Sequence, residues 1–226
     1  MSVTNFRVFF ALVFSIFLAT WFFLVVMPWI TYGHLSPITE EGSTDIKPWD
    51  VSGAAHAGEA VYAVNGCVYC HTQQVRASTS GADILRGWGT ATSQADPAKT
   101  VIRRTHPRDY IWQKQVFLGN SRSGADLSNV AHRFTTAASL YRYLYDPYVL
   151  NPHSSMPAYK FLFVKQRITG APSEDALVLE TYDMPPAGWE IVPTADARSL
   201  VAYLLSLNKG YNLPEETAPV QANYGL

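Results

Sequence analysis

The feature that most constrains this chain is a long apolar run near its amino terminus. No charged residue occurs between Arg7 and Glu40, and residues 8–26 contain only two polar side chains. At about 1.5 Å per residue, roughly twenty residues of helix cross a hydrocarbon core about 30 Å thick. Among structures that one segment can form alone, only a helix satisfies all of its backbone hydrogen bonds inside this hydrocarbon core. The run therefore predicts one transmembrane helix within residues 1–33, with Pro28 near its exit.

A cleaved signal peptide is the alternative interpretation of this run. Such a peptide normally has an apolar core of about 7–15 residues and a cleavage site with small residues. The run is longer, and residues 28–35 offer no such site, so we expect an uncleaved signal-anchor. Arg7 precedes the span, whereas Glu40, Glu41 and Asp45 follow it. The positive-inside bias then predicts a cytoplasmic amino terminus, with the rest of the chain on the outer side.

The two cysteines are the second constraint. Cys67 and Cys70 are the only ones in the chain, and His71 follows directly in the run Cys-Val-Tyr-Cys-His. This spacing is typical of c-type haem attachment, in which the histidine becomes the proximal iron ligand. A thioredoxin-like pair would need a surrounding βαβ pattern, and a zinc site would need further ligands in a recognisable spacing. We therefore expect one covalently bound haem c, held by Cys67, Cys70 and His71.

Helical patterns dominate the remainder, and no segment shows convincing strand alternation. Residues 54–66 favour a helix that ends at the haem motif. A second helix is expected near the carboxyl end, with Thr194 as its N-cap, Gly210 as its stop and an apolar stripe between them. Shorter helices are predicted at residues 107–118, 135–145 and 173–179. The fold class is therefore mainly α, with a single N-terminal transmembrane helix.

The domain organisation follows from these segments. Residues 34–53 are rich in glycine, proline, serine and acidic side chains, which is typical of a linker. We predict a transmembrane signal-anchor at residues 1–33, the linker at 34–53, a haem domain at 54–212 and a C-terminal tail at 213–226.

The order of elements in residues 54–212 resembles the small cytochrome c fold. There a first helix precedes the haem motif, and a last helix crosses the first with a small residue against an aromatic one. The resemblance implies that Gly58 or Tyr62 contacts Tyr203, and that residues 54–212 form a cytochrome c-like haem domain.

Several residues could provide the axial ligand opposite His71. Met156 and Met184 are each followed by proline, and His106, His132 and His153 are the imidazole alternatives. A Met/His pair raises the reduction potential, whereas two histidines would lower it. Spacing alone favours Met184, because it lies shortly before the last helix.

Three runs also resemble the mono-haem subunit II of cbb(3)-type cytochrome c oxidases. They are Gly-Cys-Val-Tyr-Cys-His-Thr-Gln-Gln-Val-Arg (66–76), Ser-Gly-Ala-Asp-Leu (123–127) and Asn-Pro-His-Ser-Ser-Met-Pro-Ala-Tyr (151–159). In that family the methionine of Met-Pro-Ala-Tyr is the axial ligand, which implies Met156. The chain departs from the family pattern at Ala77 and Ala125, where proline is usual.

This resemblance implies an electron-relay subunit. A membrane-anchored mono-haem cytochrome would take electrons from another c-type cytochrome and pass them to a membrane-embedded haem-copper oxidase core in aerobic respiration. It would lie in the bacterial inner (cytoplasmic) membrane, with its haem domain on the periplasmic side and no catalytic residue of its own. The alternatives are the cytochrome c subunit of a nitric oxide reductase and a free-standing anchored electron shuttle. A net charge of -1 argues against a nucleic-acid partner.

Polar side chains near the motifs are candidates to bind the haem propionates. Arg76 is the first, because its guanidinium fork can hold a carboxylate through two bonds. Gln74, Trp88 and Arg122 are further candidates.

Overall fold

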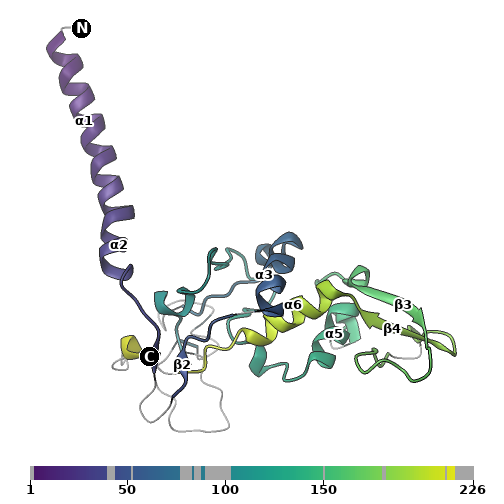
Figure 1. Cartoon of the computed structure of the whole chain (residues 1–226). Helices are drawn as coiled ribbons and strands as arrows, with labels where there is room; N and C mark the ends of the chain where they lie inside the picture. Colours follow the sequence, from purple (N-terminus) through teal and green to yellow (C-terminus); the bar gives the residue numbers. More distant parts are fainter. Residues whose placement is uncertain are drawn as a thin grey trace, which may run out of the picture. The chain divides into compact units, whose positions relative to one another are not determined.

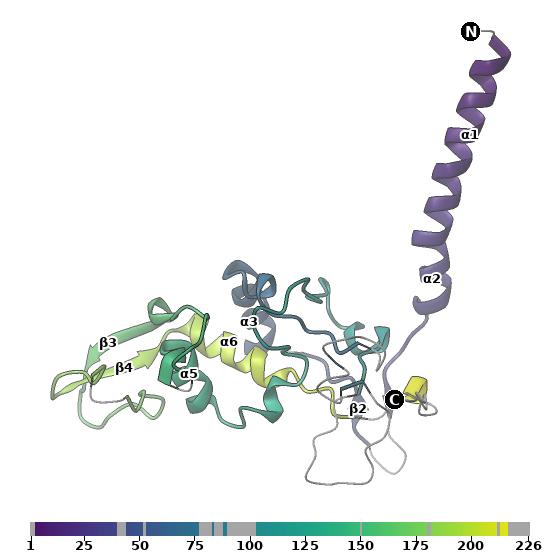
Figure 2. The ribbon, with the colours of Figure 1, turned by 180° about the vertical axis from the view of Figure 1, so that it is seen from behind.

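The computed structural model describes residues 3–39, 44–51, 53–76, 83, 88–89, 103–149, 151–179, 182–211 and 213–216. The chain forms two compact units, Met1–Pro48 with Pro107–Ile111, and Trp49–His106 with Trp112–Leu226. Figures 1 and 2 show helices as the dominant elements, as the mainly α prediction requires. The finer domain boundaries stay predictions.

A long apolar helix dominates the first unit (Figure 1). It consists of α1 (Val3–Trp21), a π-helical turn (Phe22–Val26) and α2 (Met27–Tyr32). Among the described residues it is the one helix long and apolar enough to cross a membrane, over Asn5–Tyr32. Large apolar side chains are exposed along most of its length. This exposure suits a lipid-facing anchor, because in water it would leave the apolar surface uncovered.

Pro28 does not end this helix. Proline lacks the N–H of an α-helical bond, and its ring clashes with the carbonyl four residues before it. A π turn precedes it instead, and there the Met27 N–H reaches the Phe22 carbonyl. The wider turn makes room for the proline, and the helix continues to Tyr32. The helix end at Tyr32 agrees with the anchor predicted within residues 1–33.

The first unit also contains a short pair of strands. β1 (Ile38–Thr39) pairs antiparallel with β2 (Ile46–Lys47). A 3₁₀ turn at Pro107–Tyr110 belongs to the same unit, and its Arg108 guanidinium donates to the Ser36 carbonyl. The helix predicted at residues 107–118 is wrong beyond this one turn.

In the described part of the second unit, three α-helices form the main elements. They are α3 (Ala54–Val64), α5 (Ala137–Tyr145) and α6 (Ala195–Ser206). All three were expected from their apolar spacing, and Thr136 and Thr194 cap α5 and α6 through their side chains. The α6 helix ends at Ser206, before the predicted stop at Gly210.

The α3 and α6 helices cross at Gly58. A Cβ at this position would lie 1.9 Å from the Ser199 carbonyl oxygen and 2.8 Å from the Tyr203 Cβ. Next to this contact, the Tyr62 and Tyr203 ring centroids are 5.4 Å apart. Both contacts implied by the cytochrome c resemblance are therefore present. The missing side chain of Gly58 is what allows the two backbones to approach.

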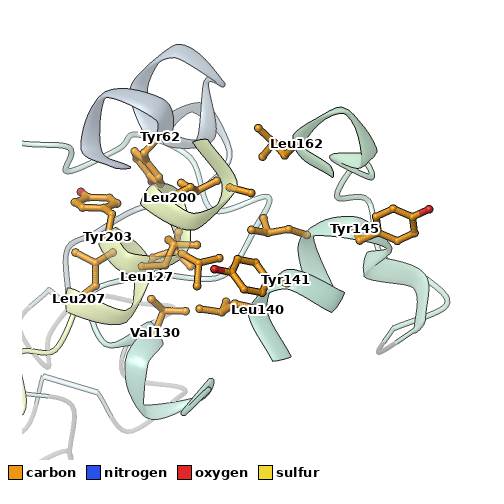
Figure 3. Close-up of a cluster of buried hydrophobic side chains, with 14 of the residues drawn as sticks. Tyr62, Leu127, Val130, Leu140, Tyr141, Tyr145, Leu162, Leu200, Tyr203 and Leu207 are labelled. Carbon is orange, nitrogen blue, oxygen red and sulfur yellow. The ribbon is translucent and has the colours of Figure 1, made fainter. Parts of the chain in front are cut away.

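One apolar core joins α3, α5 and α6 (Figure 3). Tyr62, Leu200 and Tyr203 at the helix crossing have at most 1% of their surface exposed. The cluster continues through fully or almost fully buried apolar residues, including Phe117, Leu127, Val130, Leu140, Tyr141, Leu144, Tyr145, Leu162, Phe163, Ile191 and Leu204.

The sequence patterns did not predict a two-stranded antiparallel sheet in the second unit. β3 (Phe163–Arg167) pairs antiparallel with β4 (Trp189–Pro193), with Lys165 opposite Ile191. Residues 173–179, predicted as a helix, contain none. Their Leu177 N–H donates to the Ile191 carbonyl at 2.8 Å and so extends the hydrogen bonding of β4.

The Thr194 cap gives a first testable prediction. Its hydroxyl accepts from the Ala197 N–H at 3.2 Å and donates to the Leu162 carbonyl at 2.9 Å. Thr194→Ala should lower the free energy of unfolding by about 1 kcal/mol, measured by denaturant titration. Thr194→Ser, which keeps the hydroxyl, should lose much less; an equal loss for both variants would contradict the capping role.

Candidate haem-binding site

The Cys-Val-Tyr-Cys-His motif folds as one tight turn directly after α3. Gly66 follows the end of the helix with a left-handed φ of 69°, a conformation that favours glycine. Cys67–Tyr69 then forms a 3₁₀ turn, and the His71 N–H donates to the Cys67 carbonyl at 2.9 Å. This turn holds both cysteines and His71 in one short segment beside the α3–α6 core.

The imidazole of His71 is held in one tautomer. Its Nδ1 lies 2.7 Å from the Ala125 carbonyl oxygen, which can only accept, so Nδ1 must carry the proton. Burial lowers the pKa of His71, although the bond to Ala125 raises it. The neutral ring therefore presents the lone pair of Nε2, which is the atom an iron ligand requires.

Gly124 gives this ring its space. A Cβ at position 124 would lie 2.4–2.8 Å from three atoms of the imidazole. Any residue other than glycine at position 124 would force the His71 ring to move. Ala125, where the resembled family usually has proline, contributes through its carbonyl oxygen, and proline offers the same oxygen. The substitution therefore preserves the group that orients His71.

The two thiols differ in their surroundings. Both cysteines are free; Cys67 is half-buried and Cys70 is exposed. Burial raises the pKa of Cys67 to about 11, so its thiol is protonated at neutral pH. Zinc would need further ligands, and no group of three or more His, Cys, Asp or Glu side chains suited to a metal occurs among the described residues. Two thiols together with one neutral, oriented imidazole suit a c-type haem.

The Met-Pro-Ala-Tyr run lies against the same core as the haem motif. Met156 is half-buried and packs on the core cluster. The Tyr159 phenol lies near the Cys67 sulfur and lowers the pKa of that thiol slightly, against the larger rise that burial causes. Met184, in contrast, is 61% exposed. Of the two candidate methionines, Met156 is therefore the one that packs on the same core cluster as Cys67.

The histidine alternatives have hydrogen bonds of their own. His106 accepts from the Arg104 guanidinium at 3.2 Å, and the His132 ring is 2.9 Å from Asn208. His153 is exposed, with its backbone N–H bound to the Asn151 side chain. None of these contacts involves the haem motif.

Apolar side chains of the haem motif and of the Met-Pro-Ala-Tyr run pack on the same core. Cys67, Val68, Met156 and Tyr159 are each partly buried against it. Apolar side chains around a few polar groups are typical of cofactor sites. The donor set, the cleared face of His71 and these side chains together fit one c-type haem.

The comparison with known families agrees with this fit. The family model described as "Cytochrome C oxidase, mono-heme subunit/FixO" matches residues 5–201. The chain belongs to this family. None of the curated proteins with which the sequence was compared matches it.

Membership defines the function at the level of the family. The chain is a mono-haem cytochrome c subunit of a cbb(3)-type oxidase, carries one haem and relays electrons within that complex. The match begins inside the apolar helix and ends inside α6, so it covers the anchor and most of the haem domain. The predicted subunit type, the electron-transfer role and the association with an oxidase are confirmed.

The candidate propionate-binding residues differ in their exposure and in the partners they already have. Arg122 is engaged by acceptors on the loop after His71, including Thr72 Oγ1 at 2.8 Å. Gln74 is half-buried, and its backbone N–H donates to Asp126 at 3.0 Å. Arg76 is exposed, and no described residue forms an ion pair with its guanidinium. Arg76 thus stays the first candidate of this group; Trp88 is half-buried.

Three contributors to the site were not foreseen from the residues. The Ala125 carbonyl orients His71, Gly124 clears its ring, and the Tyr159 phenol lies near Cys67. All three lie in runs that carry the family resemblance, Ser-Gly-Ala-Asp-Leu and Met-Pro-Ala-Tyr. A backbone carbonyl has no signature in the sequence, so only the folded loop could assign its role.

Proposed function

We propose that this subunit receives electrons from another c-type cytochrome and delivers them to the membrane-embedded haem-copper core of the oxidase. The family match supports the complex, and the neutral, oriented imidazole of His71 supports the haem. The bound haem iron supplies the one-electron step. The chain itself supplies orientation, ligands and an apolar lining, while oxygen is reduced in another subunit.

The attachment follows from the same motif. Cys67 and Cys70 would hold the haem through thioethers, and His71 and Met156 would ligate its iron. A haem stain should stay with the wild-type chain on a denaturing gel. Haem that acidified acetone extracts completely would overturn the covalent attachment and leave the family assignment intact.

The haem domain lies on the periplasmic side of the bacterial cytoplasmic membrane, anchored by the Asn5–Tyr32 helix. Arg7 before this helix and the acidic residues after it support the orientation. We assign the soluble cytochrome domain to residues 54–212, joined to the anchor by residues 34–53 and followed by a tail at 213–226. Arg76 binds a haem propionate at the edge of this domain.

One experiment tests the relay. In the purified native complex, the c-type haem of this subunit should be oxidised when oxygen is admitted, and oxygen should be consumed. Consumption of nitric oxide without oxygen uptake would instead assign the chain to a nitric oxide reductase. Recovery of a monomeric cytochrome after gentle solubilisation would favour a free-standing shuttle.

A further inference from the structure

The loop after His71 and the loop at residues 122–127 are joined by backbone hydrogen bonds. The Gly124 N–H donates to the Cys70 carbonyl at 2.8 Å, and the Leu127 N–H donates to the Thr72 carbonyl at 2.7 Å. The bond from His71 Nδ1 to the Ala125 carbonyl lies between these two. The position of that carbonyl therefore depends on how firmly the two loops are held together.

One guanidinium binds both sides of this junction. Arg122 donates through Nε to Thr72 Oγ1 at 2.8 Å, and through Nη2 to the Gln74 carbonyl and to Asp126, the latter at 3.5 Å. Its Nη1 donates to Asp83. Its side chain is only 12% exposed, so these bonds are largely shielded from water.

The two aspartates that accept from this guanidinium are held in place by further hydrogen bonds. Asp126 also accepts from the Thr72 hydroxyl at 2.5 Å and from the Gln74 N–H at 3.0 Å. Asp83 is fully buried, and its second oxygen accepts from the Arg76 N–H at 2.9 Å. The network spans residues 72–76 and 122–126, so both loops beside His71 are tied to the same charged centre.

We propose that Arg122 is a positioning residue for the proximal ligand: it clamps the two loops so that Ala125 keeps a short hydrogen bond to His71. This inference rests on the proposed ligation of iron by His71. A strong bond from Nδ1–H makes the imidazole a more basic ligand, which stabilises ferric over ferrous iron and lowers the reduction potential. Loosening the clamp lengthens the bond and raises the potential.

The charge of Arg122 alone would act in the opposite direction. A nearby cation disfavours the more positive ferric state, so removing it should lower the potential. Lysine separates the two mechanisms. It keeps the charge, but its ammonium lacks the planar fork that reaches acceptors on both loops. Arg122→Lys should therefore raise the potential if the residue positions the loops, and leave it unchanged if only the charge matters.

The test measures the reduction potential of the haem-loaded subunit by spectroelectrochemistry. Arg122→Lys should favour the ferrous form about tenfold at a fixed potential, an upward shift of about 59 mV. Arg122→Gln should shift the potential upward by less, because the lost charge opposes the change. The Nδ1 proton of His71 should also exchange faster in the ferrous protein by nuclear magnetic resonance. An Arg122→Lys variant with wild-type potential would overturn the proposal, whatever the glutamine variant does.

Two further variants keep the result interpretable. Arg198 also pairs with an aspartate, Asp175, at 2.6 Å, but 48% of its side chain is exposed, so Arg198→Gln should leave the potential unchanged. If the Arg122 variants fail to fold, Thr72→Val removes one arm of the clamp and should raise the potential in the same direction; an unchanged potential would overturn the proposal. Loss of low-spin haem in His71→Ala tests the ligation separately.

Discussion

Replacing Met156 with alanine should convert the ferric haem from low spin to high spin. The reduction potential should fall by on the order of 0.2 V, since axial ligands span about 0.8 V in haem proteins and a methionine ligand raises the potential. Met156 is half-buried against the core, and it belongs to the same run as Tyr159, whose phenol lies near Cys67. Optical spectra and potentiometric titration of the haem-loaded chain measure both effects.

Met184 provides the matched control. It too precedes a proline, but it is 61% exposed. Met184→Ala should leave the spectrum and the potential as in the wild type. If Met184→Ala alone abolishes the low-spin spectrum, the assignment of Met156 is wrong. If neither variant changes it, neither methionine is the sixth ligand and the assignment of Met156 is also wrong.

A second large effect is expected at the helix crossing. Gly58→Val should lower the free energy of unfolding by about 3 kcal/mol or more, because overpacking a filled core costs about 1–3 kcal/mol and here the obstacle is backbone. The new Cβ would lie 1.9 Å from the Ser199 carbonyl oxygen, which only a shift of α6 could relieve. Denaturant unfolding monitored by circular dichroism measures the loss.

Ala60→Val is the control on the same helix. Ala60 is exposed on α3, so its replacement should cost only the lower helix propensity of valine, about 0.5 kcal/mol. Equal losses at both positions would show that helix propensity, and not the α3–α6 contact, accounts for the effect. The contact would then contribute little to the stability of the haem domain.

Local patterns in the sequence were sufficient for several elements. The apolar run predicted the anchor helix, and the Thr194 cap with its following apolar stripe predicted α6. The α5 helix was also found close to its expected bounds. These elements depend on interactions between residues a few positions apart, which a sequence displays directly.

Segments whose backbone bonds lie far along the chain were predicted wrongly. Residues 107–118 looked helical, but the Leu118 carbonyl accepts from the Gln73 N–H at 3.0 Å, beside the haem motif. Residues 173–179 likewise bond to β4 instead of to themselves, and Glu190 accepts from the Ser173 N–H at 2.8 Å. In both cases a tertiary partner replaced the local helical bond.

The features of the haem site fall into the same two groups, local patterns and contacts between distant segments. The anchor and the Cys67–His71 motif could be recognised from the order of residues, because both are contiguous and chemically distinctive. The folded chain was needed to show which carbonyl orients His71, which glycine clears its ring and which methionine lies against the core. These depend on loops 50 or more residues from the motif, and a backbone carbonyl or an absent side chain acts only once folding has brought it into contact.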